Sequence, residues 1–209
     1  MTRQQWLEER KKGIGASDAA VILGLSPYKD TVQLWKEKTG RVEAEDISCK
    51  PYVQYGIQAE AHLRALFALD FPQYKVDYEE FKIIRNTEYP FIFATLDGEL
   101  TEGSRKGVWE CKTTEIFQPS QWRDWDNRVP SHYYPQLIQQ FIATGYDFAI
   151  LTAQIKYTDK RGNPTKTTRC YHFEREEVKE DMDFLLKEEL KFWEYVLSDK
   201  EPPRALPNI

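Results

Sequence analysis

The sequence is poor in cysteine and has no long hydrophobic run. Of 209 residues, three are cysteine, and they lie far apart in the chain: Cys49, Cys111 and Cys170. This spacing excludes a disulfide framework and a thiolate cluster for zinc or iron–sulfur. No apolar stretch approaches the roughly 20 residues that a membrane-spanning helix needs, so we expect a soluble protein with no membrane role. The first residues, MTRQQWLEERKKG, carry charges and no apolar segment, which predicts no secretory signal and a cytoplasmic location.

Internal repeats, low-complexity tracts and long Gly/Ser linkers are also missing. The length therefore predicts a single domain over residues 1–209, with a core of about 10–175 and an amphipathic C-terminal helix of about 176–198. Excess positive charge is absent too, because the formal net charge is −5. Such a balance argues against a protein that coats nucleic acid non-specifically. It leaves open a nuclease, which needs acidic metal ligands and only a local basic surface.

Charge is distributed unevenly along the chain. Residues 156–169 hold five basic residues and one acid, a net charge of +4. That stretch fits either a solvated hairpin or an arm that contacts phosphates. Residues 175–201 hold ten acids and five bases, a net charge of −5.

Local patterns predict an α/β or α+β domain in which helices flank a mixed central β-sheet. Helical spacing and capping residues predict helices over Asp18–Leu23 with Ser17 as N-cap, Thr31–Thr39, Pro51–Leu69, Pro135–Thr144 and Glu176–Leu197. Runs of β-branched and aromatic residues predict strands over Glu80–Arg85, Phe91–Leu100, Gly107–Thr113, Phe148–Tyr157 and Thr167–Phe173. We expect the first three of these strands to form an antiparallel meander.

The triplet Glu-x-Lys recurs, and its setting differs between copies. After residue 70 it occurs at Glu80–Lys82, Glu110–Lys112, Glu177–Lys179 and Glu189–Lys191. On a strand, residues two apart share a face, so the triplet can place a metal ligand beside a cation. The last two copies lie on the expected C-terminal helix, where residues two apart do not share a face, and we interpret them as surface charges. The first copy has no acid on a partnered strand just before it.

Glu110–Cys111–Lys112 differs because Asp97 precedes it in the chain. Two antiparallel strands joined by a short loop would bring Asp97 and Glu110 together. Charged residues in apolar strands are costly unless they are paired or bind a metal. The pattern therefore fits either a carboxylate metal site for phosphodiester cleavage or a structural ion pair between Glu110 and Lys112. Glu60, in the expected long helix, is either a third acid of the site or a solvated helix charge.

Single residues give weaker signals. His62 is either a general base or a lone, partly exposed histidine. Trp35 lies on an apolar helix and is expected in the core. Trp122 and Trp125 lie in a polar segment, where they are either exposed and able to stack on nucleic acid or packed inside.

Six motifs occur in one order: Arg10 to Ser17 in RKKGIGAS, LGLSPY, Gly56-x-x-x-Glu60, Leu96–Asp97–Gly98, Glu110–Cys111–Lys112 and Tyr134–Pro135–Gln136. With them the chain resembles the YqaJ-type viral recombinases, the λ-exonuclease branch of the PD-(D/E)xK nuclease superfamily. The resemblance implies a restriction-endonuclease-like core and a 5′→3′ exonuclease on linear double-stranded DNA. The product would be a 3′ overhang for a phage single-strand annealing protein. The resemblance also implies a phage or prophage gene in a bacterial host and a homo-oligomer, a trimeric ring.

The same resemblance assigns roles to residues. It implies that two Mg²⁺ ions, or Mn²⁺, are held by Glu60, Asp97, Glu110 and the Cys111 carbonyl. Lys112 would be the catalytic lysine, which positions or deprotonates the attacking water, with a pKa that can fall in such a cleft. Gln136 would be the helix glutamine near the active centre. The 5′-phosphate would be held by Arg10, Ser17 and Thr95.

Three alternatives use related chemistry. A PD-(D/E)xK endonuclease, of restriction or structure-specific type, would use Glu60, Asp97, Glu110 and Lys112 but cut closed circular DNA. A CRISPR-associated iron–sulfur exonuclease needs four clustered cysteines that this chain lacks. A catalytically silent DNA-binding relative is disfavoured because every catalytic position is filled.

Overall fold

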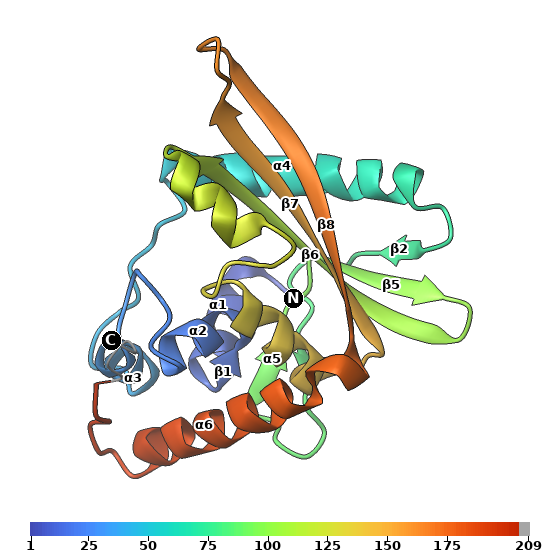
Figure 1. Ribbon diagram of the computed structural model, residues 1–209. Helices are drawn as coiled ribbons and strands as arrows, with labels where there is room; N and C mark the ends of the chain where they lie inside the picture. The colour runs from blue at the N-terminus through green and yellow to red at the C-terminus, as the bar shows by residue number, and fades with distance from the viewer. Residues whose placement is uncertain (205–209) are drawn as a thin grey trace.

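Two β-sheets form the framework of the computed structural model, which describes residues 1–204 (Figure 1). The larger sheet has five strands in the order β2 (Lys75–Asp77), β5 (Gly98–Glu102), β6 (Arg105–Ile116), β7 (Phe148–Thr158) and β8 (Pro164–Glu174). The smaller sheet has the order β1 (Ile14–Gly15), β4 (Ile92–Ala94) and β3 (Ile84–Arg85). The β1–β4 and β6–β7 pairs are parallel, and the other pairs are antiparallel.

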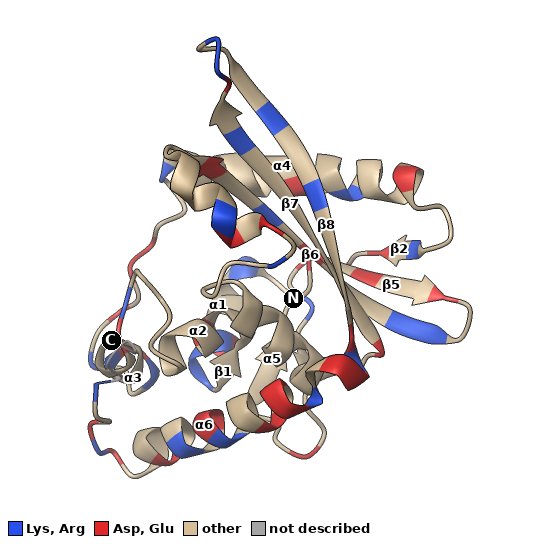
Figure 2. Ribbon diagram, viewed as in Figure 1, with Lys and Arg blue, Asp and Glu red and all other residues tan. Residues whose placement is uncertain are grey.

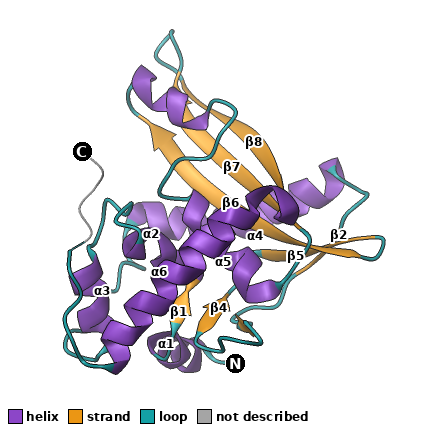
Figure 3. Cartoon of the chain, turned by 60° about the horizontal axis from the view of Figure 1, so that its bottom comes forward, coloured by secondary structure: helices purple, strands orange, loops and turns teal. Residues whose placement is uncertain are grey.

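Helices cover both faces of the larger sheet. Helix α4 (Pro51–Asp70) crosses one face, α5 (Tyr134–Thr144) lies on the other, and α6 (Lys179–Leu197) packs outside α5 (Figure 3). The remaining helical elements are α1 (Arg3–Lys11), η1 (Ala16–Asp18), α2 (Ala19–Ile22), α3 (Thr31–Lys38), η2 (Pro119–Trp125) and η3 (Arg175–Val178). This arrangement confirms the predicted mixed α/β architecture. Within residues 1–204, no helix combines the length and the apolar character needed to cross a membrane.

Apolar stripes on the helices explain why they lie against the sheet. Leu137 and Phe141, four residues apart on α5, are fully buried in one cluster with Leu151 of β7. On the opposite face, Phe67 of α4 packs against Trp109 of β6, with 5.8 Å between ring centroids. The adjoining segments 107–109 of β6 and 148–151 of β7 are therefore apolar on both faces, as is typical of strands between two helical layers.

The predicted meander is wrong, because the segment Phe91–Leu100 divides into two strands. Its first part is β4, which pairs with β1 and β3, and its second part is β5, which pairs with β2 and β6. Each part has one partner strand near it in sequence, β3 or β6, and a second one further away, β1 or β2, so local propensity could not predict the break. Asp97 lies at this crossing between the two sheets.

Predicted helix ends are mostly confirmed. Asp30 caps α3, since its Oδ1 accepts from the N–H of Gln33 at 2.8 Å, and Gly145 ends α5 with a left-handed φ of 71°. Ser17 does not cap a helix, because it lies inside the turn η1 and its hydroxyl bonds to Arg10 instead. The predicted helix at Asp18–Leu23 shortens to the four residues of α2.

One expectation about burial is wrong. Glu189 is not a surface charge, because its side chain is 0% exposed and neither carboxylate oxygen has a hydrogen-bond partner among the described residues. It lies on α6 in the same stripe as Leu185 and Phe192, four residues before and three after it. Of the two alternatives for Trp125, the structure shows the packed one, and Trp35 lies in the core as expected.

Candidate active site

The sequence-predicted carboxylates meet where β6 loses one of its neighbours. Pairing of β5 with β6 extends from Arg105 to Trp109, while pairing of β7 with β6 continues to Ile116. Within the part of the chain that the structure describes, the segment after Trp109 therefore has a partner strand on one side alone. The register of Gly98 with Trp109 places Asp97 next to Glu110. The expected juxtaposition of these two acids is present.

Asp97 lies at the first position where β6 has no second partner strand. Its Oδ2 accepts from the backbone N–H of Cys111 at 2.9 Å. The N–H and C=O of one strand residue face the same side, so the carbonyl of Cys111 also points towards the open edge. The carbonyl oxygen of Cys111 is therefore available as a metal ligand next to Asp97.

Helix α4 brings the third acid to the same place. A side chain at Gly56 would place its Cβ 3.3 Å from Thr113 Oγ1, so glycine allows the close approach of α4 to β6. Glu60, one helical turn later, then faces a pocket of about 210 Å³. The pocket is lined by Gly56, Glu60, Asp97, Glu110, Cys111, Lys112, Thr113 and Gln136.

Glu110 is the most tightly held of the three acids. Its side chain is 1% exposed, and its Oε1 lies 2.7 Å from Lys112 Nζ and accepts from Gln136 Nε2 at 2.6 Å. Lys112 Nζ also donates to Gln136 Oε1 at 2.8 Å, which closes a ring of three side chains. The structural ion pair considered above therefore exists, and it lies inside the pocket. Gln140 Nε2 donates to the other oxygen, Oε2 of Glu110.

Sequence reasoning missed two residues of this site. Gln140 follows Gln136 by one helical turn, so both amides lie on one face of α5, and that spacing was a usable signal. Arg64 follows Glu60 by the same interval, and its Nη1 donates to Glu60 Oε1 at 2.9 Å and to the backbone carbonyl of Asp97. The Arg64 guanidinium also lies 3.6 Å from the centroid of the Tyr78 ring.

The carboxylates of the pocket disfavour one another's ionisation. Burial, followed by the charges of Glu110 and Glu60, raises the pKa of Asp97 well above its usual range. Burial also raises the pKa of Glu60, although Arg64 opposes the shift. The same burial and carboxylates raise the pKa of the Cys111 thiol, which therefore stays protonated. A divalent cation would relieve this repulsion.

Lys112 remains a cation among these acids. Burial disfavours its charged form, but Glu110 and Asp97 outweigh burial and raise the pKa of the ammonium group. The expectation that its pKa can fall is wrong for the side chains present. Among these side chains Lys112 is placed to act as a positive charge and a hydrogen-bond donor.

The donor set fits a hard divalent cation. Carboxylates and a backbone carbonyl are the ligands that Mg²⁺ and Mn²⁺ prefer, and Mg²⁺ often keeps several waters beside one or two carboxylates. Within residues 1–204, no three acidic, thiol or imidazole side chains already form a closed ligand group. Asp97, Glu110 and the Cys111 carbonyl could hold such an ion with water. Glu60 could join them only after giving up its bond to Arg64.

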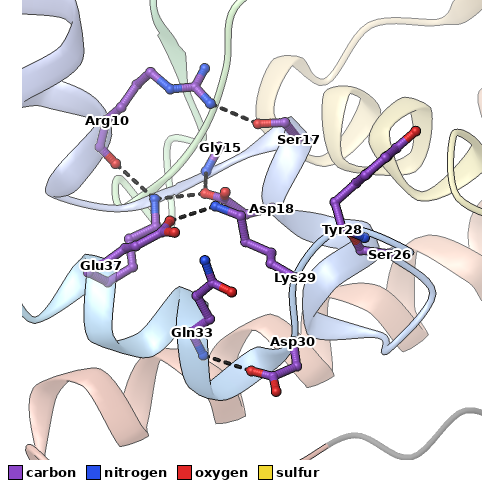
Figure 4. Close-up of polar contacts among 11 residues, drawn as sticks. Arg10, Gly15, Ser17, Asp18, Ser26, Tyr28, Lys29, Asp30, Gln33 and Glu37 are labelled. Atoms are coloured by element: carbon purple, nitrogen blue, oxygen red, sulfur yellow. Dashed lines mark hydrogen bonds and ion pairs between the residues drawn. The ribbon is translucent and has the colours of Figure 1, made fainter. Parts of the chain in front are cut away.

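The residues expected to bind a 5′-phosphate also come together. Arg10 Nη2 donates to Ser17 Oγ at 2.7 Å, from the end of α1 to the turn η1 (Figure 4). The Arg10 guanidinium lies 4.6 Å from the ring centroid of Trp6, whose Nε1 donates to Thr95 Oγ1 at 3.0 Å. Since Thr95 is two residues from Asp97, this polar strip leads from Ser17 towards the carboxylates.

A larger hollow lies elsewhere on the molecule. It has a volume of about 760 Å³ and lies between β8 and the 125–129 segment. Asp126 is the single acid in its lining, so it offers no carboxylate cluster. His62, the suggested general base, is not among the residues that line either hollow.

Comparison with known sequences identifies the family. The family model of the YqaJ-like viral recombinase domain matches residues 5–147. The chain belongs to the YqaJ-like viral recombinases. It is 32% identical over 208 residues to the uncharacterized protein YqaJ of Bacillus subtilis (strain 168), an alignment that covers 97% of this chain and 59% of that protein. This YqaJ-like chain thus spans about three fifths of that relative's length.

Solved structures with a similar fold include two exonucleases. An alkaline exonuclease, LHK-Exo from Laribacter hongkongensis, matches with a TM-score of 0.68 and 16% identity over 94% of this chain and 93% of that one. A phage related exonuclease from Haemophilus somnus 129PT matches with a TM-score of 0.56 and 13% identity over 90% and 96%. At these identities the likeness establishes the fold.

Proposed function

We propose that the chain is a metal-dependent 5′→3′ exonuclease that degrades one strand of linear double-stranded DNA and leaves a 3′ overhang. The observation that carries the proposal is the pocket at the open edge of β6. There Asp97, Glu110 and the Cys111 carbonyl offer hard oxygen donors beside the Lys112 ammonium. Metal-dependent hydrolysis of a phosphodiester bond uses both features: ligands that hold Mg²⁺ and a cation that binds a phosphate oxygen.

The residues of the chain divide the work in this proposal. Asp97, Glu110 and the Cys111 carbonyl, with Glu60 once released by Arg64, would hold Mg²⁺ or Mn²⁺ as a two-ion site. When bound, such ions lower the pKa of a water and stabilise charge on the leaving 3′-oxygen. Lys112 binds a non-bridging oxygen of the phosphate and offsets the negative charge that develops there.

Arg10 and Ser17 provide the basis for 5′-end polarity. Ser17 is exposed and the Arg10 guanidinium beside it is half-buried, so the pair can accept a terminal phosphate with charge-assisted hydrogen bonds. Thr95 adds a hydroxyl on the side of the carboxylates. A 5′-phosphate held there would place the first phosphodiester towards Asp97, which favours cleavage from that end.

The deciding experiment compares DNA ends. Purified protein is incubated with linear duplex DNA bearing 5′-phosphate or 5′-hydroxyl ends and with closed circular DNA, each in Mg²⁺ or in EDTA. We expect Mg²⁺-dependent release of nucleotides from linear DNA alone, faster with the 5′-phosphate. Duplexes labelled at one 3′ or one 5′ end report the polarity directly.

The other outcomes of this experiment would each indicate a different activity for the chain. Nicking of the circle would replace the exonuclease with an endonuclease of the same superfamily. Absence of cleavage with any metal would indicate a nuclease fold that only binds DNA. The annealing protein and the ring-shaped trimer stay proposals based on resemblance; light scattering of the purified chain tests the latter.

A further inference from the structure

The hairpin formed by β7 and β8 extends beyond the rest of the molecule and carries basic residues to its tip (Figures 1 and 2). Lys160 and Arg161 are exposed at the turn, and Lys166 is exposed on β8. Within residues 1–204, no carboxylate oxygen lies within 4.0 Å of the charged nitrogens of these three side chains. By contrast, many other lysines and arginines of the chain form ion pairs.

The one acid near the tip of the hairpin is used to build the turn. Asp159 Oδ1 accepts from the N–H of Arg161 at 2.8 Å and from the N–H of Asn163 at 2.9 Å. Gly162, with φ of 84°, adopts the left-handed conformation that completes the turn. Asp159 therefore stabilises the backbone and pairs with none of the cations.

Two lysines lie directly opposite each other on the paired strands of the hairpin, and this arrangement destabilises the hairpin. The register places Lys156 of β7 directly opposite Lys166 of β8. Like charges in this position repel each other. Glu115 lies beside Lys156 on β6 without forming an ion pair within 4.0 Å, and Lys156 instead lies 3.0 Å from the ring centroid of Tyr55. Among the described residues no carboxylate within 4.0 Å neutralises either lysine, and a polyanion would reduce their repulsion.

Strand register gives the position of these cations relative to the pocket. Lys112 of β6 is level with Ala153 of β7, and Lys156 lies three residues further towards the tip. At about 3.3 Å per strand residue, the Lys156–Lys166 row is roughly 10 Å beyond the pocket and the turn roughly 20 Å. With about 3.4 Å per base pair, these distances match about three to six base pairs of duplex.

We propose that the β7–β8 hairpin binds the phosphate backbone of the duplex about three to six base pairs from the end being cut. This inference rests on the proposed function for its substrate, but not on catalysis. Lys160, Arg161 and Lys166 would each neutralise a phosphate and release a counterion. The contact is independent of base sequence, and it would hold the enzyme on DNA between cuts.

The test measures binding in EDTA, where no metal-dependent cleavage can occur. The variant K160Q/R161Q/K166Q is compared with wild type on stem-loop DNA with stems of about 16 and about 4 base pairs, the shorter ending before the turn. The control variant K179Q/K187Q/K200Q removes the same three charges from exposed positions on or just after α6. Circular dichroism verifies that both variants fold.

We expect the hairpin variant to bind the long stem at least about 10-fold more weakly, and to lose about two to three units from the slope of log Kd against log salt. Its loss on the short stem should be clearly smaller, and the control should follow wild type. Equal binding by wild type and the hairpin variant, or an equal loss in the control, would overturn the proposal. So would a hairpin variant whose molecular mass in solution falls while its DNA binding is unchanged, because the hairpin would then contact a second copy of the chain.

The binding result is separable from the proposed nuclease activity. Hairpin-dependent binding by a protein that cleaves nothing would support this inference and remove the proposed function. If wild type cleaves DNA but binds it independently of the hairpin, the proposed function would be supported and this inference would be removed.

Discussion

Asp18 and Lys38 form a buried ion pair, with 2.7 Å between Asp18 Oδ2 and Lys38 Nζ. The same Oδ2 accepts from the N–H of Gly15 at 3.0 Å, and Lys38 Nζ donates to the backbone carbonyl of Arg10 at 2.9 Å (Figure 4). Burial opposes the charge on Asp18, but Lys38 and Arg10 outweigh it and lower the pKa of the carboxyl. The pair thus holds the backbone on both sides of the Arg10–Ser17 contact.

We expect Lys38→Met to weaken the preference for a 5′-phosphate. The substitution leaves Asp18 charged and unpaired, at a cost of about 3–5 kcal/mol in unfolding free energy, and frees the Arg10 carbonyl. The ratio of kcat/KM on 5′-phosphorylated and 5′-hydroxyl ends should fall, with less change on hydroxyl ends. Lys36→Met, on the same helix, is the control. A folded Lys38 variant with the wild-type ratio would show that the pair is structural only.

Lys112→Ala should abolish turnover and leave DNA binding nearly intact. The ammonium is buried beside Glu110, where it can contact a phosphate oxygen, and loss of one preorganised donor to developing charge costs about 100-fold to 1,000-fold in rate. Nucleotide release measures turnover, and fluorescence anisotropy in EDTA measures binding. Lys106→Ala, exposed on the same strand, should behave as wild type. Substantial cleavage by the Lys112 variant would remove this residue from the mechanism.

Gln140→Leu should weaken the response to Mg²⁺. The Gln140 amide donates to the inner oxygen of Glu110, which the substitution leaves without that donor. Residues that orient metal ligands in this way typically contribute 10–100-fold in metal affinity, so we expect a shift of about that size in the Mg²⁺ concentration for half-maximal cleavage. An unchanged Mg²⁺ titration would show that Gln140 only fills space.

Glu189→Met should stabilise the protein at neutral and alkaline pH. Burial, and then the charge of Asp18, raises the pKa of Glu189 well above its ordinary value of 4.5. Below that value the carboxyl is neutral in both folded and unfolded chains, so it costs least there. As pH rises towards the folded-state pKa, the unfolded chain ionises alone and the wild type loses stability.

The measurement is thermal or urea unfolding from pH 4 to pH 8. The gain of the Met variant over wild type should be about 1–3 kcal/mol at the acid end, the usual cost of a buried polar group without partners, and should increase towards the alkaline end as only the unfolded wild-type chain ionises. Glu194→Met, exposed on the same helix, should change stability by less than about 0.5 kcal/mol. A stability difference between the Met variant and wild type that stays constant across this pH range would contradict the raised pKa assigned to Glu189.

Local patterns were sufficient for much of the fold. The cap at Asp30, the stop at Gly145 and the apolar stripe of α5 each depend on residues within a few positions, and the structure has them where the sequence predicts. The convergence of Asp97 and Glu110 was also predictable, because a hairpin with a short loop has few possible registers.

The sequence alone therefore determined the longer helices, most of the strands and the acid pair, since capping, periodicity and short loops act over a few residues. Tertiary structure decided three further features: the division of Phe91–Leu100 between two sheets, the burial of Glu189, and the raised pKa of Lys112. Each involves partners many residues away, such as β1 for β4 and Asp97 for Lys112, and the free energy of a buried charge is set by its neighbours in space.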